Sequence, residues 1–395
     1  MRHFGDHYID GQWVTAGGAP RPLIDPNTED PWATVATGGT AADVDRAVMA
    51  ARRAFASFAR SSVAERVALI DRIIAAYQRR EAELSLLIAQ EVGVPVSFRA
   101  QVAGPAGHMQ VARDVIAAYA FESQLAGTIV RREAIGVCAL ISPWNWPIQT
   151  SVLKVIYGIA AGCTMVLKPS DASPASGVAL AEVMHEAGVP PGVFNLVIGR
   201  GSVVGEALSR HPQVDMVSFT GSTTAGIKVG EAAAQTVKRV CLELGGKSAN
   251  IVLPDANLEH AARWNIQRGF SNSGQSCHAP SRMLVHQDQV DQVLTYLQDE
   301  IGRMRFGDPR DPATTHGPLV HAQQYASVQR HIQIGLDEGA QLVMGGIGRV
   351  AGLNRGFYGQ PTVLAGVTPD MTLAREEIFG PVLVVIPYPT EDEAL

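Results

Sequence analysis

Apolar residues recur at a spacing of three to four along residues 41–89, as Val44, Val48, Ala51 and Phe55 illustrate. This spacing places them on one face of a helix. Packing of that face into a core explains the pattern without any functional role. The preceding segment is rich in Gly, Pro, Thr and Asp and has only short strand-like stretches. We therefore predict a helical region that follows an irregular, partly extended N-terminal segment.

From Ala134 onward, apolar runs rich in β-branched residues alternate with segments of helical periodicity. We predict strands at Ile135–Ile141, Thr164–Lys168, Phe194–Ile198, Met216–Thr220, Arg239–Leu244 and Asn250–Leu253. We predict helices at Thr150–Ala161, Pro174–Ala187, Ser202–Ser209 and Thr223–Ala234. Such alternation is typical of βαβ units with a parallel sheet. Ligands bind beyond the carboxyl ends of such strands, so the loops after Ile141, Leu167, Phe219 and Leu242 should share one edge.

One of these connections resembles a dinucleotide-binding loop only in part. Gly199, Gly201 and Gly205 lie between a predicted strand and a predicted helix, but the fingerprint needs its third glycine at position 204, where Val204 stands. A glycine-bearing strand-to-helix turn explains the segment equally well.

Length and composition indicate a globular protein of two or three domains, because 395 residues exceed one simple core. The formal net charge of -6 and the lack of a Lys/Arg-rich block argue against a nucleic-acid partner. The longest apolar stretch, Val152–Leu167, contains Lys154 and is shorter than the about 20 residues of a membrane span. The N-terminus lacks the apolar segment of a signal peptide, so we expect a cytoplasmic protein without a membrane partner.

The cysteines and histidines give no metal-binding pattern. Cys138, Cys163, Cys241 and Cys277 are far apart in the sequence, and the 11 histidines form no HExxH or HxH motif. So few cysteines in a chain of this size fit a reducing compartment. We predict no metal site.

Cys277 ends the segment Phe270–Cys277, which is rich in Asn, Ser, Gly and Gln. A lone cysteine is most often a small buried apolar residue. These polar and flexible neighbours are unsuited to a core, however, and favour a tight turn that presents a thiol at a cleft. Cys277 is therefore a candidate nucleophile.

Two other polar residues follow predicted strands. Glu243 precedes a Gly-Gly pair and Lys247, so it could form a surface ion pair with Lys247. A buried carboxylate at a strand end would instead have a raised pKa and could act as a base. Asn145 lies between Pro143 and Pro147. It is either an ordinary turn asparagine or an amide donor for a developing oxyanion.

Three further segments carry candidate binding residues. Lys168 and Asp171 could form a solvated pair or hold ribose hydroxyls at a strand end. The small residues Thr220–Gly226 open a helix, which suits a pyrophosphate, although a plain Ser or Thr helix cap is common. Arg375–Val382 would alone be described as a charged turn before a strand.

Taken together and in this order, these segments resemble the signatures of the aldehyde dehydrogenase superfamily. The matching motifs are PWNWP, KPSD, FTGSTTAG, ELGGK, GQSC followed by Arg282, and EEIFGPV, and the likeness runs from about Tyr8 to Leu395. The resemblance implies an α/β fold with a Rossmann-like parallel-sheet cofactor domain, an α/β catalytic domain and a bridging β-hairpin. It places the cofactor domain at residues 1–115 and 135–243, the bridging and oligomerisation hairpin at 116–134, and the catalytic domain at 244–395.

The resemblance implies a role for each candidate residue. Cys277 would be the nucleophile, Glu243 the base that activates water, and Asn145 the oxyanion donor together with the Cys277 backbone N–H. Trp146 would line the aldehyde channel. The cofactor-binding residues would be Trp144, Lys168, Ser170, Asp171, Gly221, Ser222, Leu244, Glu377 and Phe379. Lys168 and Asp171 would hold the adenosine ribose, Ser222 would meet the pyrophosphate, and Glu377 and Phe379 would contact the nicotinamide riboside.

The implied activity is oxidation of a small-molecule aldehyde to a carboxylic acid through a cysteine thiohemiacetal and thioester. Many NAD-using members carry Glu where this chain has Asp171. Aspartate is also an anion that would repel a 2′-phosphate, so we predict NAD as cofactor rather than NADP.

The end of the chain departs from the family, whose members normally continue further. Thr390–Glu393 matches a capping box, which predicts a helix that begins just before the chain stops. The alternative to an active enzyme is therefore a truncated, catalytically incompetent fragment that at most binds nucleotide. Ester or thioester hydrolysis without hydride transfer is a third possibility. A complete chain would be expected to form a homodimer or tetramer.

Overall fold

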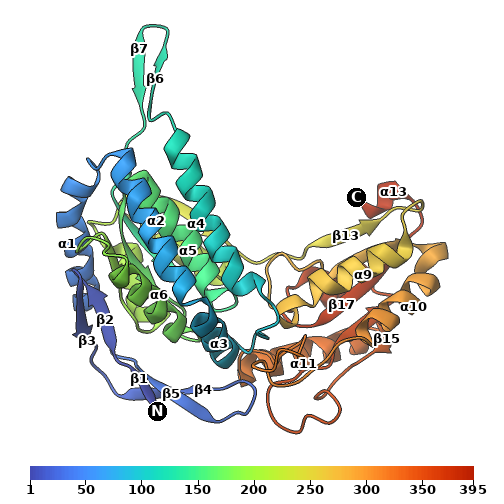
Figure 1. Ribbon diagram of the computed structural model, residues 1–395. Coiled ribbons are helices and arrows are strands. Elements are labelled where there is room, and N and C mark those ends of the chain that lie inside the picture. The colour runs from blue at the N-terminus through green and yellow to red at the C-terminus, as the bar shows by residue number, and fades with distance from the viewer. The chain divides into compact units, whose positions relative to one another are not determined.

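The computed structural model describes residues 1–395 and divides them into two compact units. The first unit comprises Met1–Leu23, Pro31–Glu91 and Arg99–Leu244. The second unit comprises Ile24–Asp30, Val92–Phe98 and Gly245–Leu395. Figure 1 shows that each unit is built of a sheet and helices. The main transition between units follows Leu244, and two short segments from the N-terminal part of the chain also belong to the second unit.

The first unit contains a seven-stranded sheet. Its strands, from one edge to the other, are β12 (Arg239–Glu243), β11 (Met216–Thr220), β8 (Val137–Ile141), β9 (Thr164–Lys168), β10 (Phe194–Leu196), β2 (Asp6–Ile9) and β3 (Gln12–Thr15). The strands from β12 to β10 are parallel, and β2 and β3 extend the sheet with antiparallel pairs. The prediction that the loops after β8, β9, β11 and β12 share one edge is confirmed.

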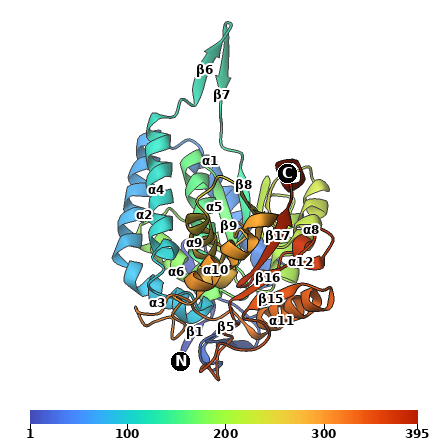
Figure 2. The same cartoon turned by 90° about the vertical axis from the view of Figure 1, so that its right-hand side faces the viewer.

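Burial explains why these central strands could be identified from the sequence. Every residue of β8 and β9 is buried, as in parallel sheets covered on both faces. Helices α1 (Ala41–Phe58) and α7 (Glu206–Arg210) pack near this sheet and contribute Val44, Val48 and Leu208 to its core. Helices α2 (Val63–Arg79), α4 (Ala100–Ala118), α5 (Pro147–Ala161) and α6 (Pro174–Glu186) form a neighbouring helical layer (Figure 2).

The helical region at residues 41–89 is interrupted by new helix starts. Thr40 and Asp43 form a capping box at α1, and Ser62 and Glu65 form another at α2. A third helix, α3, covers Glu81–Val92. The predicted helix at residues 202–209 is a π-helical turn, Gly201–Gly205, that continues into α7. Helix α8 (Thr223–Ala234) has the predicted bounds.

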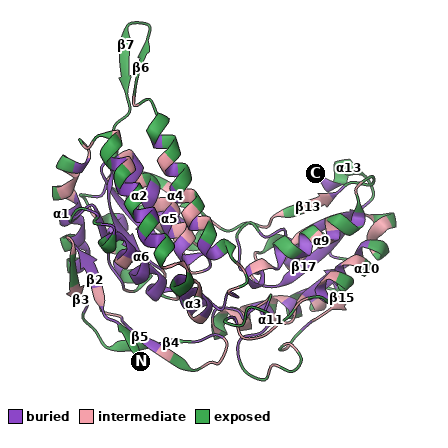
Figure 3. Cartoon of the chain, viewed as in Figure 1, coloured by how far each residue is buried: buried purple, intermediate pink, exposed green.

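A two-stranded hairpin, β6 (Glu122–Leu125) and β7 (Thr128–Arg131), extends beyond the end of α4 (Figures 1 and 2). Ala126 and Gly127 form its turn with φ values of 48° and 84°. Positive φ at both central turn positions is the geometry of tight hairpins. Every residue of both strands is exposed (Figure 3). A separate three-stranded sheet has the order β1 (Arg2–Phe4), β5 (Pro31–Ala36) and β4 (Pro20–Ile24).

The second unit contains a five-stranded sheet. Its order is β13 (Ala249–Val252), β14 (Arg282–His286), β17 (Val382–Tyr388), β16 (Thr362–Ala365) and β15 (Gln341–Met344). All pairs are parallel except β15 with β16. One core includes residues of α9 (Leu258–Gly269) and α10 (Val290–Ile301), and another includes residues of α11 (Ala322–Asp337) and α12 (Thr372–Arg375). The strand predicted at Asn250–Leu253 is β13, which belongs to this second sheet.

The last helix, α13 (Glu391–Ala394), begins where the sequence predicts but lacks the expected capping box. The Glu393 N–H donates to the Thr390 carbonyl at 3.1 Å instead of to the Thr390 hydroxyl. The hydroxyl donates to the Glu393 carboxylate at 3.5 Å. In the whole structure, no helix combines the length and apolar character that a membrane crossing requires.

Candidate active site

The loop after β9 holds a charged pair at the carboxyl edge of the first sheet. Lys168 is buried, and its Nζ lies 2.6 Å from Oδ1 of Asp171. Burial lowers the pKa of Lys168, and the Asp171 carboxylate opposes this shift. The second oxygen, Oδ2, accepts a hydrogen bond from the Gly201 N–H at 3.3 Å. The aspartate is thus fixed through both carboxylate oxygens.

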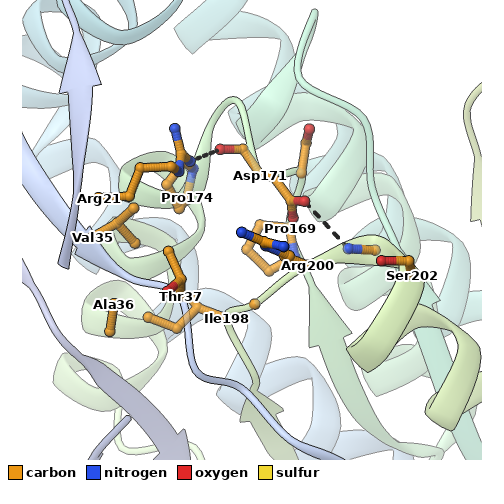
Figure 4. A pocket seen from close by; sticks show the side chains of 13 residues that line it. Arg21, Val35, Ala36, Thr37, Pro169, Asp171, Pro174, Ile198, Arg200 and Ser202 are labelled. Carbon is orange, nitrogen blue, oxygen red and sulfur yellow. Dashed lines mark hydrogen bonds between the residues drawn. The ribbon is translucent and has the colours of Figure 1, made fainter. Parts of the chain in front are cut away.

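Asp171 lines a pocket of about 310 Å³ in the first unit (Figure 4). The pocket also contains polar groups of Arg21, Thr37, Ser170, Arg200 and Ser202. Arg21 donates to the Asp171 carbonyl at 2.6 Å. One anion among hydroxyls and guanidinium groups can bind the hydroxyls of a sugar, and the arginines add affinity for nearby negative charge.

A second cavity of about 600 Å³ shares Gly201 and Ser202 with this pocket. Ser222 lines this cavity and forms the N-cap of α8, where its Oγ accepts from the Ala225 N–H at 3.4 Å. The plain cap that the sequence allowed is therefore present. The same helix N-terminus also retains N–H groups and a dipole that favour an anion.

Two glycines make space around the first turn of α8. A Cβ at Gly226 would lie 2.4 Å from Cδ2 of Leu244, so the absence of a side chain lets Leu244 pack against the helix. A Cβ at Gly221 would lie 2.6 Å from the Phe219 ring. The Gly221 N–H also donates to the Glu243 carbonyl at 3.0 Å. The loops after β11 and β12 are therefore joined, as the parallel register of Thr220 with Glu243 requires.

Asn145 lies in the loop between β8 and α5 and is buried. Its carbonyl accepts a hydrogen bond of 3.0 Å from Nε2 of Gln101, another buried residue. Pro147 occupies the first turn of α5, and the Trp146 carbonyl accepts from the Thr150 hydroxyl at 2.7 Å. Trp146 is buried and Trp144 is half-buried. The loop backbone is therefore held from α4 on one side and by the start of α5 on the other.

The expected burial of Glu243 is wrong. Glu243 is exposed, because β12 is the edge strand of its sheet and most of its residues face solvent. Desolvation therefore gives no reason for this carboxylate to act as a base. Lys154, also in the first unit, donates from its Nζ to the Ser218 Oγ at 2.8 Å. Burial lowers the pKa of Lys154 to about 8, and Cys241 and Glu243 oppose this shift.

In the second unit, Cys277 follows a loop with unusual backbone geometry. Asn272 and Ser273 have φ values of 52° and 55°, in the left-handed region that costs energy for residues with a side chain. Gly274 has φ of 74°, and a Cβ there would lie 2.1 Å from the Gly380 carbonyl oxygen. Only glycine fits at this close approach. Cys277 itself is exposed, as expected for a presented thiol.

Buried hydrogen bonds hold this loop in place. The Ser273 hydroxyl donates to the Gly317 carbonyl at 2.7 Å. Gln275 is buried, and its Oε1 accepts from the Val320 N–H at 2.9 Å. Its Nε2 donates back to the Asn272 carbonyl at 3.1 Å. The loop that precedes Cys277 is thus tied both to itself and to residues 317–320.

Glu377 packs against the Gly-Gly turn that follows Leu244. A Cβ at Gly245 would lie 2.2 Å from Oε2 of Glu377, so the glycine allows this approach. Burial raises the pKa of Glu377, opposed by a hydrogen bond from the Gly246 backbone and by the charge of Lys247. Lys247 is half-buried with its Nζ buried, and burial together with the Arg282 charge lowers its pKa to about 8. Within the second unit, Glu377 is therefore the carboxylate that faces Lys247.

Phe379 has a positive φ of 58°, which is uncommon for an aromatic residue. Nε2 of Gln324 donates to the carbonyls of Ile378 at 3.2 Å and Phe379 at 2.9 Å. The segment that carries Glu377 and Phe379 is thus anchored to α11. No three His, Cys, Asp or Glu side chains of the chain group together in a way that could hold a metal ion.

The structure brings some candidates together and separates others between units. Ser170 and Asp171 line one pocket, and the buried Lys168 forms an ion pair with Asp171. Asn145 and Glu243 belong to the first unit, whereas Cys277 and Glu377 belong to the second. Five polar residues of these surroundings belong to no motif of the sequence: Arg21, Gln101, Lys154, Arg200 and Gln324. Only two had a visible feature, since Lys154 interrupts an apolar stretch and Arg200 stands inside the imperfect glycine fingerprint.

Comparison with known proteins identifies the family. The family model described as "Aldehyde dehydrogenase family" matches residues 13–395. The chain is 48% identical to a 3-succinoylsemialdehyde-pyridine dehydrogenase from Pseudomonas sp, over 100% of this chain and 83% of that protein. It is 43% identical to a putative aldehyde dehydrogenase from Staphylococcus aureus (strain MSSA476), over 100% of this chain and 84% of that protein.

Solved structures agree with this assignment. Aldehyde dehydrogenase C from Pseudomonas syringae, a mutant in complex with NAD+ and octanal, superposes with a TM-score of 0.97 at 48% identity, covering 99% of this chain and 81% of that one. An aldehyde dehydrogenase from Bartonella henselae gives a TM-score of 0.97 at 42% identity, covering 100% and 84%. The predicted aldehyde-dehydrogenase-like α/β fold is confirmed, and the chain belongs to the aldehyde dehydrogenase family.

Proposed function

We propose that the protein oxidises an aldehyde to a carboxylic acid, with NAD as the hydride acceptor. The observation that carries this proposal is the exposed Cys277 thiol at the end of a fixed loop, in a chain of this family. The P. syringae relative, which was solved with NAD+ and octanal, supports both the cofactor and an aliphatic aldehyde as substrate.

The residues present fit a nicotinamide dinucleotide. Asp171 and Lys168 offer an acceptor and a donor for the adenosine ribose, and Ser170 lines the same pocket. Gly221 and Ser222 open α8 toward a pyrophosphate, and Leu244 packs beside that turn. Oε1 of Glu377 is buried without a hydrogen-bond partner, which suits a ribose hydroxyl. Two aromatic residues complete the proposed cofactor-binding set. Phe379 would lie next to the nicotinamide, and Trp144 would line the cofactor cleft.

The catalytic sequence begins with the Cys277 thiolate, which adds to the aldehyde carbon. The Asn145 amide and the Cys277 backbone N–H stabilise the resulting alkoxide. Bound NAD supplies the hydride acceptor for the oxidation that converts the thiohemiacetal to a thioester. Glu243 then removes a proton from water, which hydrolyses the thioester and releases the acid. The exposed position of Glu243 gives it ready access to that water.

Asp171 favours NAD over NADP in this proposal. Its carboxylate is held by Lys168 and Gly201, so it cannot easily move away from a 2′-phosphate. Like charges at close range repel, by about 4 kcal/mol at 4 Å near a protein surface. The phosphate of NADP would meet this fixed charge in the pocket.

We infer that residues 1–115 and 135–243 bind the dinucleotide, that residues 244–395 carry the nucleophile, and that the hairpin within 116–134 serves oligomerisation. A homodimer or tetramer would cover the exposed Leu125 and Ile129 of that hairpin. None of the four cysteines forms a disulfide, which is consistent with a cytoplasmic location.

Formation of NADH from NAD and octanal by the purified chain, recorded beside a size-exclusion trace, tests this function. Steady turnover is the expected result. An incompetent fragment would form no NADH, and a hydrolase of esters would cleave an ester substrate without NAD. Release of octanoate in equal amount to NADH would establish the hydrolytic outcome. NADH without octanoate would contradict the role of Glu243.

A further inference from the structure

Helix α6 begins directly after the loop that carries Lys168 and Asp171, and its first turns are buried. The first N–H groups of any helix have no partner within the helix. Ser173 occupies the N-cap position, but its side chain makes no capping hydrogen bond. The Ser173 Oγ is itself buried without a partner. The N-terminus of α6 therefore needs an acceptor from elsewhere in the chain.

Glu91, near the end of α3, supplies that acceptor. Its Oε1 accepts from the Ala175 N–H at 2.7 Å. Its Oε2 accepts from the Ser176 N–H at 3.0 Å and from the Ser176 hydroxyl at 2.5 Å. Glu91 is 3% exposed, and a carboxylate at this end of a helix is also favoured by the helix dipole. One buried side chain thus replaces the missing local cap.

The first turn of α6 is in direct contact with the ribose-binding loop. A Cβ at Gly177 would lie 2.6 Å from both Cβ and Cγ of Pro169, so the helix and the loop approach without a side chain between them. Pro169, Asp171 and Pro174 all line the 310 Å³ pocket. Any shift of this helix turn therefore moves the wall that carries Asp171.

The loop has few ways to absorb such a shift. The Ser173 N–H donates to the Ser170 carbonyl at 3.1 Å, which closes a tight turn. Lys168 anchors its other end through β9 and the ion pair with Asp171. A displacement of the α6 N-terminus is therefore transmitted to Pro169 and Asp171.

We propose that Glu91 is a positioning residue for the cofactor: by capping α6 from another helix, it fixes the Lys168–Asp171 pair that binds the adenosine ribose. This inference rests on the proposed function, because it assigns NAD to that pocket. Glu91 does not touch the cofactor and takes no part in the chemical steps. Its effect falls on NAD affinity.

The test is NAD binding and steady-state kinetics of Glu91→Ala and Glu91→Gln. We expect Glu91→Ala to raise Kd and KM for NAD about tenfold. The values of kcat and of KM for the aldehyde should stay within about twofold of the unaltered enzyme. Glu91→Gln retains one carbonyl acceptor, so its Kd and KM for NAD should lie between those of Glu91→Ala and those of the unaltered enzyme. It also serves as the test variant should Glu91→Ala fail to fold.

Two controls separate positioning from general instability. Glu65→Ala removes a capping carboxylate from α2, which does not line the pocket, and should leave KM for NAD unchanged. Alkylation of Cys277 by iodoacetamide, followed on its own peptide by mass spectrometry, should proceed at the same rate in every folded variant. Unchanged NAD affinity in folded Glu91 variants would overturn the inference alone. Absence of NAD binding by the unaltered protein would instead overturn the proposed function.

Discussion

Lys168 and Asp171 form an ion pair of 2.6 Å in which the lysine side chain is 4% exposed and the aspartate side chain 47% exposed. Lys168 lies at the buried end of a strand, whereas Asp171 lines the pocket. The buried ammonium holds one carboxylate oxygen, and the Gly201 N–H holds the other. The exposed part of Asp171 therefore presents a negative charge whose position is set from within the protein.

Replacement of this charge should change cofactor preference. Asp171→Ser removes the repulsion of a 2′-phosphate and leaves Arg21 and Arg200 in the same pocket to attract it. We expect the ratio of kcat/KM for NADP to that for NAD to rise about tenfold to a hundredfold. Steady-state kinetics with both cofactors measures this ratio. Asp171→Glu, which keeps the charge, should retain the preference for NAD, and an unchanged ratio in Asp171→Ser would rule out charge repulsion as its basis.

Cys277→Ala should abolish aldehyde oxidation, because it removes the thiol that forms the thioester. NAD affinity should change by less than about twofold, since the alanine disturbs only the thiol. Calorimetric titration with NAD and the NADH assay measure the two properties. Cys241→Ala is the matched control and should remain active. Loss of NAD binding in Cys277→Ala would show that this cysteine has a structural role.

Glu243→Gln should permit one rapid release of NADH and then stop, since the thioester forms but water is not activated. We expect steady-state kcat to fall at least about a hundredfold, the lower limit for loss of a general base. Rapid-mixing absorbance measurements resolve the burst from turnover. Glu259→Gln, at an exposed glutamate of α9, should show normal turnover. Normal turnover of Glu243→Gln as well would remove this residue from the role of base.

Gly274→Ala should destabilise the Cys277 loop. The new Cβ would combine a positive φ with a close approach to the Gly380 carbonyl, at a cost of about 3 kcal/mol or more in the free energy of unfolding. Gly188→Ala has a similar positive φ but no heavy atom within 4 Å of the new Cβ, so only about 1 kcal/mol should be lost. Urea denaturation of both variants makes the comparison. Equal losses would mean that the contact with Gly380 can relax.

Glu91 should make stability depend on pH in a defined direction. Burial raises its pKa from 4.5 to about 7, against the hydrogen bonds from Ala175 and Ser176 that favour the carboxylate, so between these two pH values the folded state keeps a proton that the unfolded chain releases. Its contribution to stability is present in full below pH 4.5 and is lost as the pH rises through 7. This difference between the pKa values of the unfolded and folded states corresponds to about 3 kcal/mol in the free energy of unfolding. Urea denaturation across this pH range should show the loss of stability in the unaltered protein and not in Glu91→Gln. If stability depended on pH in the same way in both proteins, Glu91 would not be the group responsible.

The central strands could be predicted from the sequence because they are buried on both faces. Thr164–Lys168 and Met216–Thr220 have the predicted bounds. The strand predicted at Arg239–Leu244 is also present, as β12, but it is not buried, since Val240 and Leu242 are 39% and 37% exposed at the sheet edge. An apolar run indicates a strand but not its place in the sheet.

Contacts between distant segments could not be predicted at all. Arg21 reaches the Asp171 carbonyl from 150 residues away in the chain, and Glu91 caps α6 from 84 residues away. Local periodicity and motif spacing carry no information on such pairings. The motifs therefore identified the side chains proposed for the chemistry, whereas the residues that hold them in place emerged only from the fold.

The hairpin of β6 and β7 has a consequence for how the protein behaves in solution. None of its residues is buried, and a two-stranded hairpin without a covered face is at best marginally stable in water. In a solitary chain its backbone amides should exchange with deuterium almost as fast as those of a peptide. Slow exchange confined to Glu122–Leu125 and Thr128–Arg131 would mean that another surface lies over the hairpin. The exchange rate of these few amides therefore indicates whether the protein self-associates through the hairpin.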